Sequence, residues 1–292
     1  NATVFDNEPQ IEEVVFYGSN KTEPDGDDII YIEQNVTNAS DVLYNWTAPV
    51  WEVDDNTVLL LHFNNRSFYG ENDTYVVDFS NSSYNGSITP AESSQRLTFY
   101  NFTGGAQLGA GLGFEGSGTA GDSPVSVENV TFGDQDELIG IDYTWLILIR
   151  IQNTSASGTI LTKQSGTNGL SISQELSNLV IIADANTINL SDFFVNEEIV
   201  QLAVTLDNSN NLQVYKNATL VNLTTGITVT DNNAPFDILT LGTTVTIFMG
   251  TLDEVAILNR TLTDREILNS YTLPPDTYYW YVNATDYSGE PL

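Results

Sequence analysis

Short runs of apolar and β-branched residues recur along this chain, and polar turn residues separate them. Within most runs apolar and polar positions alternate, as they do in strands with one buried face. The turns between them are rich in Asn, Asp, Gly and Ser. Many short strands joined by such turns are typical of a β-sandwich or barrel. The pattern predicts strands over residues 11–17, 29–34, 58–63, 144–151, 159–164, 179–183, 199–206, 212–216, 245–249, 252–258 and 278–286.

Two segments depart from simple alternation. Residues 145–149 are apolar on both faces, which predicts a central strand that is buried on both sides. Thr263 and Glu266 have the spacing of a capping box, in which each side chain accepts a hydrogen bond from the other residue's backbone amide. Ile267 and Tyr271 follow at helical spacing, so we expect one short helix packed on the sandwich.

The chain divides into three segments. Residues 1–55 hold a few strands and an acidic turn, and residues 56–272 form a long β-rich block. Residues 273–292 begin close to two prolines and carry one strong strand. A single strand is not stable alone. We therefore expect the last strand to pair with a sheet edge that the first segment offers.

Four motifs of the middle block follow one another in a recognisable order. They are the apolar strand at 58–64, the polar turn at 78–86, the glycine-rich strand at 109–116 and the stretch 250–267. Together they resemble the laminin-G-like, concanavalin-A-like jelly-roll module of bacterial and archaeal surface proteins, and the last stretch is the most specific. The resemblance implies an all-β fold, with a concanavalin-A-like jelly-roll sandwich over residues 56–272.

The two flanking segments resemble an immunoglobulin-like domain cut in two. Residues 9–46 are similar to its early strands and residues 276–291 to its last strand. The jelly roll is then inserted into a loop of a small immunoglobulin-like β-sandwich, at a point where few contacts are broken. We expect Trp46 and Trp280 to share the core of this split domain. A disordered leader and tail around one domain is the alternative.

The charge balance excludes several partners. The 292 residues include 39 Asp and Glu against 8 Lys and Arg, which gives a formal net charge of −31. A nucleic-acid-binding protein needs clustered Lys and Arg, and an anionic membrane repels so acidic a chain. No apolar run approaches the roughly 18 residues of a membrane-spanning helix. We expect neither nucleic acid as a partner nor insertion into a membrane.

Asn-x-Ser/Thr sequons are unusually frequent. The chain has 17 of them, whereas 30 Asn and 55 Ser and Thr in 292 residues would give about six by chance. The excess predicts an extracellular or cell-surface protein that carries N-linked glycans, with co-occurrence of these residues in turns as the alternative. A sequon-rich acidic chain without cysteine resembles archaeal cell-surface and filament glycoproteins. The acceptors are Asn1, Asn20, Asn35, Asn38, Asn45, Asn65, Asn72, Asn81, Asn85, Asn101, Asn129, Asn153, Asn189, Asn217, Asn222, Asn259 and Asn283.

Catalytic signatures are scarce. His62 is the only histidine and lies in a predicted strand, where a structural role is expected. The Gly-x-Gly-x-x-Gly pattern at 111–116 lacks the βαβ context of a dinucleotide site. Asp253 and Glu254 are adjacent, so strand alternation predicts that they point to opposite faces and do not form a glycosidase pair. We predict no catalytic residues and no enzyme activity.

A structural Ca²⁺ ion is implied by the resemblance. Related jelly rolls often hold one Ca²⁺, and Asn64, Asp78 and Asp253 match the positions of its ligands. Asn64 stands where the family usually has Asp, which removes one charge. Two acidic turns also offer carboxylates to a cation, with a solvated turn as the alternative. Their residues are Asp25, Asp27 and Asp28 in one turn and Asp134, Asp136 and Glu137 in the other.

Two classes of function remain. The sequence favours a non-enzymatic extracellular structural glycoprotein, a repeating module or subunit of a filament, sheath or surface layer. Its partners are then copies of itself or neighbouring modules, and we expect the end at Leu292 to lead into the next Asn1 of a tandem array. The alternative is a carbohydrate-binding adhesin or lectin module, which the fold family implies without fixing it. Sugar binding needs an exposed aromatic platform, for which the candidates are Tyr69, Tyr75, Tyr84 and Tyr100.

Overall fold

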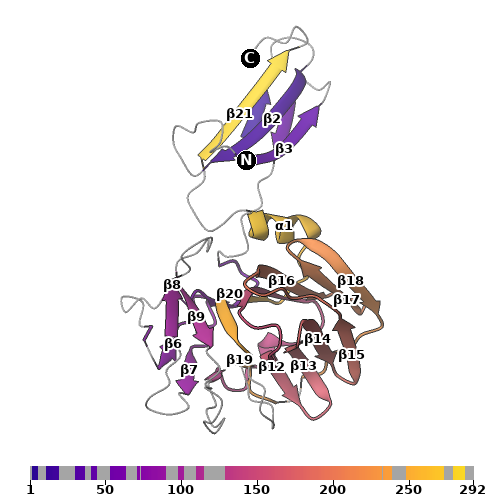
Figure 1. The fold of residues 1–292 in the computed structure, drawn as a ribbon. Helices are drawn as coiled ribbons and strands as arrows, with labels where there is room; N and C mark the ends of the chain where they lie inside the picture. The colour runs from indigo at the N-terminus through magenta and orange to yellow at the C-terminus, as the bar shows by residue number, and fades with distance from the viewer. Residues whose placement is uncertain are drawn as a thin grey trace. The chain divides into compact units, whose positions relative to one another are not determined.

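The structure is a computed structural model, and it divides the chain into two compact units. Unit 1 combines Asn1–Pro49 with Pro275–Leu292, and unit 2 is Val50–Pro274 (Figure 1). In the part of the chain that the structure describes, no helix is long and apolar enough to cross a bilayer. The described residues are 2–5, 11–19, 30–36, 41–44, 53–63, 71–72, 74–89, 98–101, 110–114, 129–231, 233–238, 248–272 and 279–286.

Unit 1 contains two small antiparallel sheets. Strand β1 (Ala2–Phe5) pairs with β4 (Asp41–Tyr44). Strand β2 (Ile11–Ser19) lies between β3 (Ile30–Val36) and β21 (Tyr279–Asp286). The last strand of the chain thus pairs with a strand of the first segment, as expected. Trp46 lies outside the described residues, so the core that it is expected to share with Trp280 stays a prediction, as does the immunoglobulin-like assignment.

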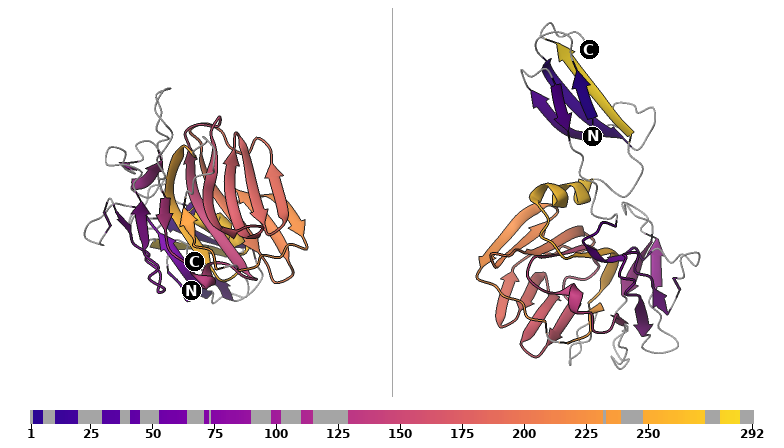
Figure 2. Two further views of the ribbon diagram at one scale, coloured as in Figure 1. Left: turned by 90° about the horizontal axis from the view of Figure 1, so that it is seen from below. Right: turned by 180° about the vertical axis from the view of Figure 1, so that it is seen from behind.

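Unit 2 is built on two large antiparallel sheets (Figure 2). Sheet I has the strand order β15-β14-β13-β12-β19-β10-β7-β6. Its strands are β6 (Tyr75–Val76), β7 (Gly86–Thr89), β10 (Asn129–Thr131), β12 (Ser157–Ser165), β13 (Asn168–Glu175), β14 (Asn178–Ala183), β15 (Asn186–Leu190) and β19 (Asp237–Ile238).

Sheet II has the order β18-β17-β16-β11-β20-β9-β8, and β5 pairs with β20 beside this path. Its strands are β5 (Thr57–Leu61), β8 (Thr98–Asn101), β9 (Ala110–Phe114), β11 (Tyr143–Ile151), β16 (Ile199–Leu206), β17 (Asn211–Lys216), β18 (Thr219–Thr225) and β20 (Gly250–Leu258). A short 3₁₀ helix, η3 (Asp136–Leu138), precedes β11.

The central strand of sheet II is β11, which lies between β16 and β20. Trp145, Ile147 and Ile149 point into the main core between the two sheets, whereas Leu146 packs on the opposite face of sheet II. The prediction of a strand buried on both faces over 145–149 is therefore confirmed. Each such side chain contributes about 1.5–3 kcal/mol by leaving water, so β11 anchors both layers.

Helix α1 (Asp264–Thr272) covers part of the outer face of sheet II. Its capping box is present, because Glu266 N donates to Thr263 Oγ1 at 3.3 Å and Thr263 N donates to Glu266 Oε2 at 2.9 Å. Ile267 is buried in a second core between the helix and the sheet, while Tyr271 is exposed. Tyr215 Oη donates to Asp264 Oδ1 at 2.7 Å and fixes the start of the helix on β17.

Candidate functional site

The two faces of sheet I differ in character. One row of cross-strand neighbours points into the main core and is entirely apolar. It consists of Ile88, Val130, Ile238, Leu161, Ile172, Ile181 and Ile188. Because side chains alternate along each strand, the adjacent row lies on the face that turns away from the core. That face is the first candidate for a binding surface.

The adjacent row, which we call the outer row, runs across all eight strands of sheet I and is mostly polar. Its only carboxylate is Asp237, between Thr131 and Thr162 on the neighbouring strands. Asp237 was not predicted from the sequence, although it lies between two buried apolar residues, Phe236 and Ile238. The outer row consists of Tyr75, Ser87, Thr131, Asp237, Thr162, Ser171, Ile182 and Thr187.

Asp237 is the polar centre of the outer row. Only 8% of the residue is exposed, and burial raises the pKa of its carboxyl group, while a hydrogen bond with Thr131 opposes that shift. Its Oδ1 atom is buried and has no hydrogen-bond partner among the described residues. A buried acceptor without a partner costs about 1–3 kcal/mol, and a ligand hydroxyl that displaced the groups covering this carboxyl group and donated to it would remove that penalty.

The four tyrosines proposed for sugar stacking lie in different parts of the chain. Tyr75 is half-buried at the end of the outer row. Tyr84 packs partly against the main core and donates from its hydroxyl to Glu137 Oε2 at 2.6 Å, which raises the pKa of Tyr84 to about 12. Tyr100 lies on β8, where only the backbone is described, and Tyr69 lies outside the described residues. Of the two tyrosines with described side chains, Tyr75 therefore belongs to the outer row.

A β-bulge on β20 overturns one expectation from the sequence. Ile147 pairs with Val255 and Ile149 with Leu252, so two residues of β20 lie opposite the single residue between them on β11. Leu252 and Val255 both pack in the main core, and strict alternation fails at the Asp-Glu pair between them. The prediction that Asp253 and Glu254 point to opposite faces relied on strict alternation, which the bulge interrupts at this pair.

The two carboxylates at the bulge are almost fully buried and affect each other. Burial, together with the charge of Glu254, raises the pKa of Asp253 to about 8. Neither Asp253 oxygen has a hydrogen-bond partner among the described residues. Burial also raises the pKa of Glu254, which His62 opposes through a 2.6 Å contact between Nδ1 and Glu254 Oε2. His62, which follows β5, is thus a structural neighbour of Glu254, and its ring packs at a tilt against Phe79, with the ring centroids 4.7 Å apart.

The proposed Ca²⁺ ligands are not equivalent. Asn64 lies outside the described residues. Asp78 already accepts four hydrogen bonds, from Leu60 N and Ser80 N on Oδ1 and from Ser80 Oγ and Tyr84 N on Oδ2, all at 2.7–2.9 Å. A carboxylate has about four lone-pair positions, so Asp78 has none left for a metal. Asp253 has two free oxygens and fits a cation far better.

The acidic turn at 134–137 is organised around a lysine. Lys163 is fully buried, and its Nζ atom lies 2.8 Å from Asp134 Oδ1 and 3.1 Å from Asp231 Oδ1 and donates to Ala234 O at 2.9 Å. Asp134, Asp136 and Asp231 are the one group of three acidic residues within metal-binding distance in the described chain. The ammonium group of Lys163 supplies the positive charge there. Of the predicted turn residues, Glu137 instead binds Tyr84, and 25–28 lie outside the description.

The sequons occupy accessible positions. Nine acceptor asparagines have described side chains, and every one of them is exposed or half-buried. A glycan acceptor needs such access, so these positions are compatible with modification. The nine are Asn72, Asn81, Asn85, Asn129, Asn153, Asn189, Asn217, Asn222 and Asn259. Asn35, Asn101 and Asn283 lie on strands with described backbone only, and Asn1, Asn20, Asn38, Asn45 and Asn65 lie outside the described residues.

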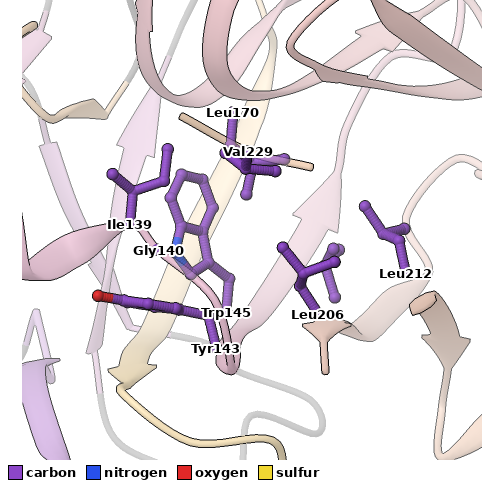
Figure 3. Close-up of a pocket in the computed structure, with 9 residues that line it drawn as sticks. Ile139, Gly140, Tyr143, Trp145, Leu170, Leu206, Leu212 and Val229 are labelled. Atoms are coloured by element: carbon purple, nitrogen blue, oxygen red, sulfur yellow. The ribbon is translucent and has the colours of Figure 1, made fainter. Parts of the chain in front are cut away.

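An apolar cavity lies between the sheets at one end of unit 2. Figure 3 shows the indole of Trp145 in its middle, with Ile139 on one side and Leu206 and Leu212 on the other. The cavity has room for little more than one water molecule, and its walls are almost wholly apolar. Trp145 Nε1 donates to Leu138 O at 3.1 Å, so its polar atom is satisfied. This space is too small for a sugar ring.

These features define a class of fold: a jelly-roll β-sandwich with one helix on sheet II and a polar outer face on sheet I. The chain belongs to the concanavalin A-like lectin/glucanases superfamily, because the Laminin_G_3 family model matches residues 119–268, just over half of its length. The resemblance that the sequence motifs indicated is therefore confirmed. No curated protein matches the sequence significantly.

Several solved structures share this fold at low sequence identity. The receptor-binding domain of botulinum neurotoxin type G is 15% identical, with a TM-score of 0.52 over 75% of this chain and 51% of that one. The binding domain of botulinum neurotoxin DC, in complex with SialylT, is 15% identical, with a TM-score of 0.51 over 74% of this chain and 51% of that one. The binding domain of Paraclostridial Mosquitocidal Protein 1 is 14% identical, with a TM-score of 0.55 over 74% of this chain and 52% of that one. This chain therefore spans about half the length of the structures that it matches.

Proposed function

We propose that this chain is a non-enzymatic carbohydrate-binding module that holds its ligand on the outer row of sheet I. The carrying observation is Asp237, whose unpaired Oδ1 lies in a row of hydroxyl side chains with Tyr75 at its end. Hydroxyl groups donate and accept, as sugar hydroxyls do. The receptor-binding toxin domains with a similar fold support a binding role, as does the superfamily.

An uncharged sugar fits this surface best. The chain carries a net charge of −31, so it repels sialylated and sulfated glycans at long range. The outer row itself offers no Lys or Arg to pair with an acidic sugar. It contains one carboxylate, Asp237, whereas glycoside hydrolysis usually needs two acidic groups across the scissile bond. Binding without turnover is therefore the chemistry that the outer row supports.

Replacing Asp237 with asparagine tests the sugar site. A hydrogen bond to a charged group is worth about 1.5–3 kcal/mol, so Asp237→Asn should weaken neutral-glycan binding about tenfold or more. The measurement is binding of the purified chain to an array of neutral and sialylated oligosaccharides. Glu175→Gln is the matched control, because Glu175 is an exposed carboxylate at the end of β13 in the same sheet. An array without any signal, or equal losses in both variants, would contradict the proposal.

A structural role in an extracellular filament, sheath or surface layer is the second candidate. The observation in its favour is that all nine sequon side chains that the structure describes are accessible. Glycans at these positions would coat unit 2 and place the chain outside the cytoplasm. In that role we expect polymers of the native glycoprotein in negative-stain micrographs and no signal on the glycan array. Dispersed particles in the micrographs, together with binding on the glycan array, would contradict the structural role and support the first proposal.

We also infer a structural Ca²⁺ site at Asp253, without Asp78 as a ligand. Asp253 is wholly buried, its two oxygens are unpaired, and Glu254 lies beside it. Burying a carboxylate without a partner is costly, and a divalent cation would compensate that cost. A bound Ca²⁺ would supply positive charge and oxygen coordination, and would take no part in sugar chemistry there. Asn64 stays a proposed ligand because it lies outside the described residues.

A further inference from the structure

The sequons are not spread evenly over the strands. Six acceptor asparagines lie inside strands that the structure describes, and five of these belong to edge strands. The sixth, Asn129, is the first residue of the interior strand β10. The described edge strands hold fewer residues than the described interior strands, yet they contain five of the six acceptor asparagines. The five are Asn35 on β3, Asn101 on β8, Asn189 on β15, Asn222 on β18 and Asn283 on β21.

Each of the four edge strands at the ends of the two large sheets contains an acceptor asparagine or pairs with one. Sheet I ends at β15, which contains Asn189, and at β6, whose Tyr75 forms a bridge with the acceptor Asn72. Sheet II ends at β18, which contains Asn222, and at β8, which contains Asn101. The three-stranded sheet of unit 1 ends at β3 and β21, each with one acceptor. In the described part of the two-stranded sheet, β1 and β4 contain none.

The four edge strands at the ends of the two large sheets lack the usual protection against pairing with another chain. Soluble proteins commonly place Lys, other charges or Pro on exposed edges. The strands β6, β8, β15 and β18 contain no charged residue and no proline. On β18, Leu220, Val221 and Leu223 are all exposed. Without a covering group this edge is a template for an additional strand.

Strand β5 is an edge strand of sheet II without a sequon, and its open side is covered in another way. It pairs with β20 on one side only, and all five of its residues are buried. The turn that follows β6 covers its other side, because Phe79 N donates to Leu60 O and Ser80 Oγ donates to Val58 O. The protein's own backbone therefore protects β5, which has no need of another cover.

The two edge acceptors with described side chains are open to modification. Asn189 is exposed, and Asn222 is half-buried with its Oδ1 accepting from Thr224 Oγ1 at 2.9 Å. The contact leaves the Nδ2 atom of Asn222, to which a sugar would be joined, without a partner among the described residues. Neighbouring strands lie about 4.7–4.9 Å apart, and a branched sugar chain is much wider than that spacing. A glycan on an edge strand thus denies a second strand its approach.

We propose that N-glycans on the edge strands keep the sheets of this chain from pairing with those of a second copy. The inference rests on occupancy of the sequons, as the second candidate function does, but it depends neither on sugar binding by the outer row nor on the formation of polymers. The partner that the glycans exclude is another copy of the chain, because the same uncharged edges are present on both. When the edge glycans are missing, the β18 edges of two copies should join.

The test compares two variants of the full chain made in a host that attaches N-glycans. The edge variant carries Asn101→Gln, Asn189→Gln and Asn222→Gln, and the control variant carries Asn81→Gln, Asn153→Gln and Asn259→Gln in turns. Each removes three acceptors. Sedimentation velocity is measured in 0.5 M NaCl, which screens the repulsion between acidic chains. We expect the edge variant to form dimers and larger species with rising concentration, and the control to sediment as the parent does.

Two further measurements keep the outcome decisive. Thr224→Ala removes the Asn222 sequon without changing the asparagine. It should also promote association, and it replaces the edge variant in the test if that variant folds poorly. Adding Leu223→Lys to the edge variant should restore the monomer, because a charge on β18 opposes strand pairing. Peptide mass spectrometry that finds Asn101, Asn189 and Asn222 bare in the glycosylated parent would overturn the proposal. Equal sedimentation of the edge and control variants would overturn it as well, whatever the glycan array shows.

Discussion

Asp253→Asn should make the metal-free protein more stable at neutral and alkaline pH. In the folded chain, burial and the charge of Glu254 hold the pKa of Asp253 at about 8, against 3.8 for an ordinary Asp carboxyl group in water. Between these values the folded carboxyl keeps a proton that the unfolded carboxyl has lost, so stability falls as pH rises. The loss is about 1.4 kcal/mol per pH unit for one group. An asparagine does not titrate, so the variant should escape this loss.

The measurement is urea unfolding of both proteins in EDTA at several pH values from 4 to 8. The difference in free energy of unfolding should grow with pH in favour of the variant, to about 3–5 kcal/mol at pH 8. Millimolar Ca²⁺ near pH 7.5 should raise the melting temperature of the parent protein and leave that of Asp253→Asn unchanged. A difference in free energy of unfolding that does not change with pH would refute the raised pKa of Asp253. A melting temperature of the parent protein that changes with neither EDTA nor Ca²⁺ would exclude the Ca²⁺ site.

Asp78→Ala should destabilise unit 2 strongly, with or without Ca²⁺. The side chain accepts hydrogen bonds from three backbone amides, of Leu60, Ser80 and Tyr84, and from the hydroxyl of Ser80. It is buried, so water does not readily replace it. Each buried donor left without a partner costs about 1–3 kcal/mol, and we expect a total loss of at least about 3 kcal/mol.

Asp207→Ala is the matched control for this change. Asp207 also accepts several hydrogen bonds within a turn, from Ser209 N, Asn211 N and Asn211 Nδ2, but that turn faces solvent. Water can satisfy its donors, so a smaller loss is expected. Chemical unfolding in EDTA and in Ca²⁺ should give the same deficit for Asp78→Ala. A deficit that appears only with Ca²⁺ would instead identify Asp78 as a metal ligand.

Sequence patterns predicted the apolar strands well and the polar ones poorly. β16 begins and ends at the predicted residues, and β11 differs by one residue at its start, because their apolar runs leave one interpretation. β13 and β18 were not predicted, since Ser, Thr, Asn and Gln make up at least half of their residues and pairing with neighbours holds them in the sheet. The segment 245–249 lies mostly outside the described residues.

The candidate sites depended on register, which a single sequence does not reveal. The outer row joins residues from eight strands, and only the pairing places Tyr75 and Asp237 in one line. The bulge on β20 likewise cannot be predicted from the sequence by assuming that buried and exposed residues alternate. Asp231 was missed as a neighbour of Asp134 because the two are brought together only through the buried Lys163. Composition alone could indicate that acceptor asparagines are abundant, but not that they favour sheet edges.

The pairing of β2 with β21 has a consequence for biosynthesis. A ribosome makes β2 before unit 2 and β21 after it, so the three-stranded sheet of unit 1 cannot form until the whole of unit 2 has been synthesised. Until then β2 has one neighbour instead of two, and long-range pairing of this kind is slow to form. A chain that terminates within unit 2 lacks β21, so it cannot complete the three-stranded sheet of unit 1.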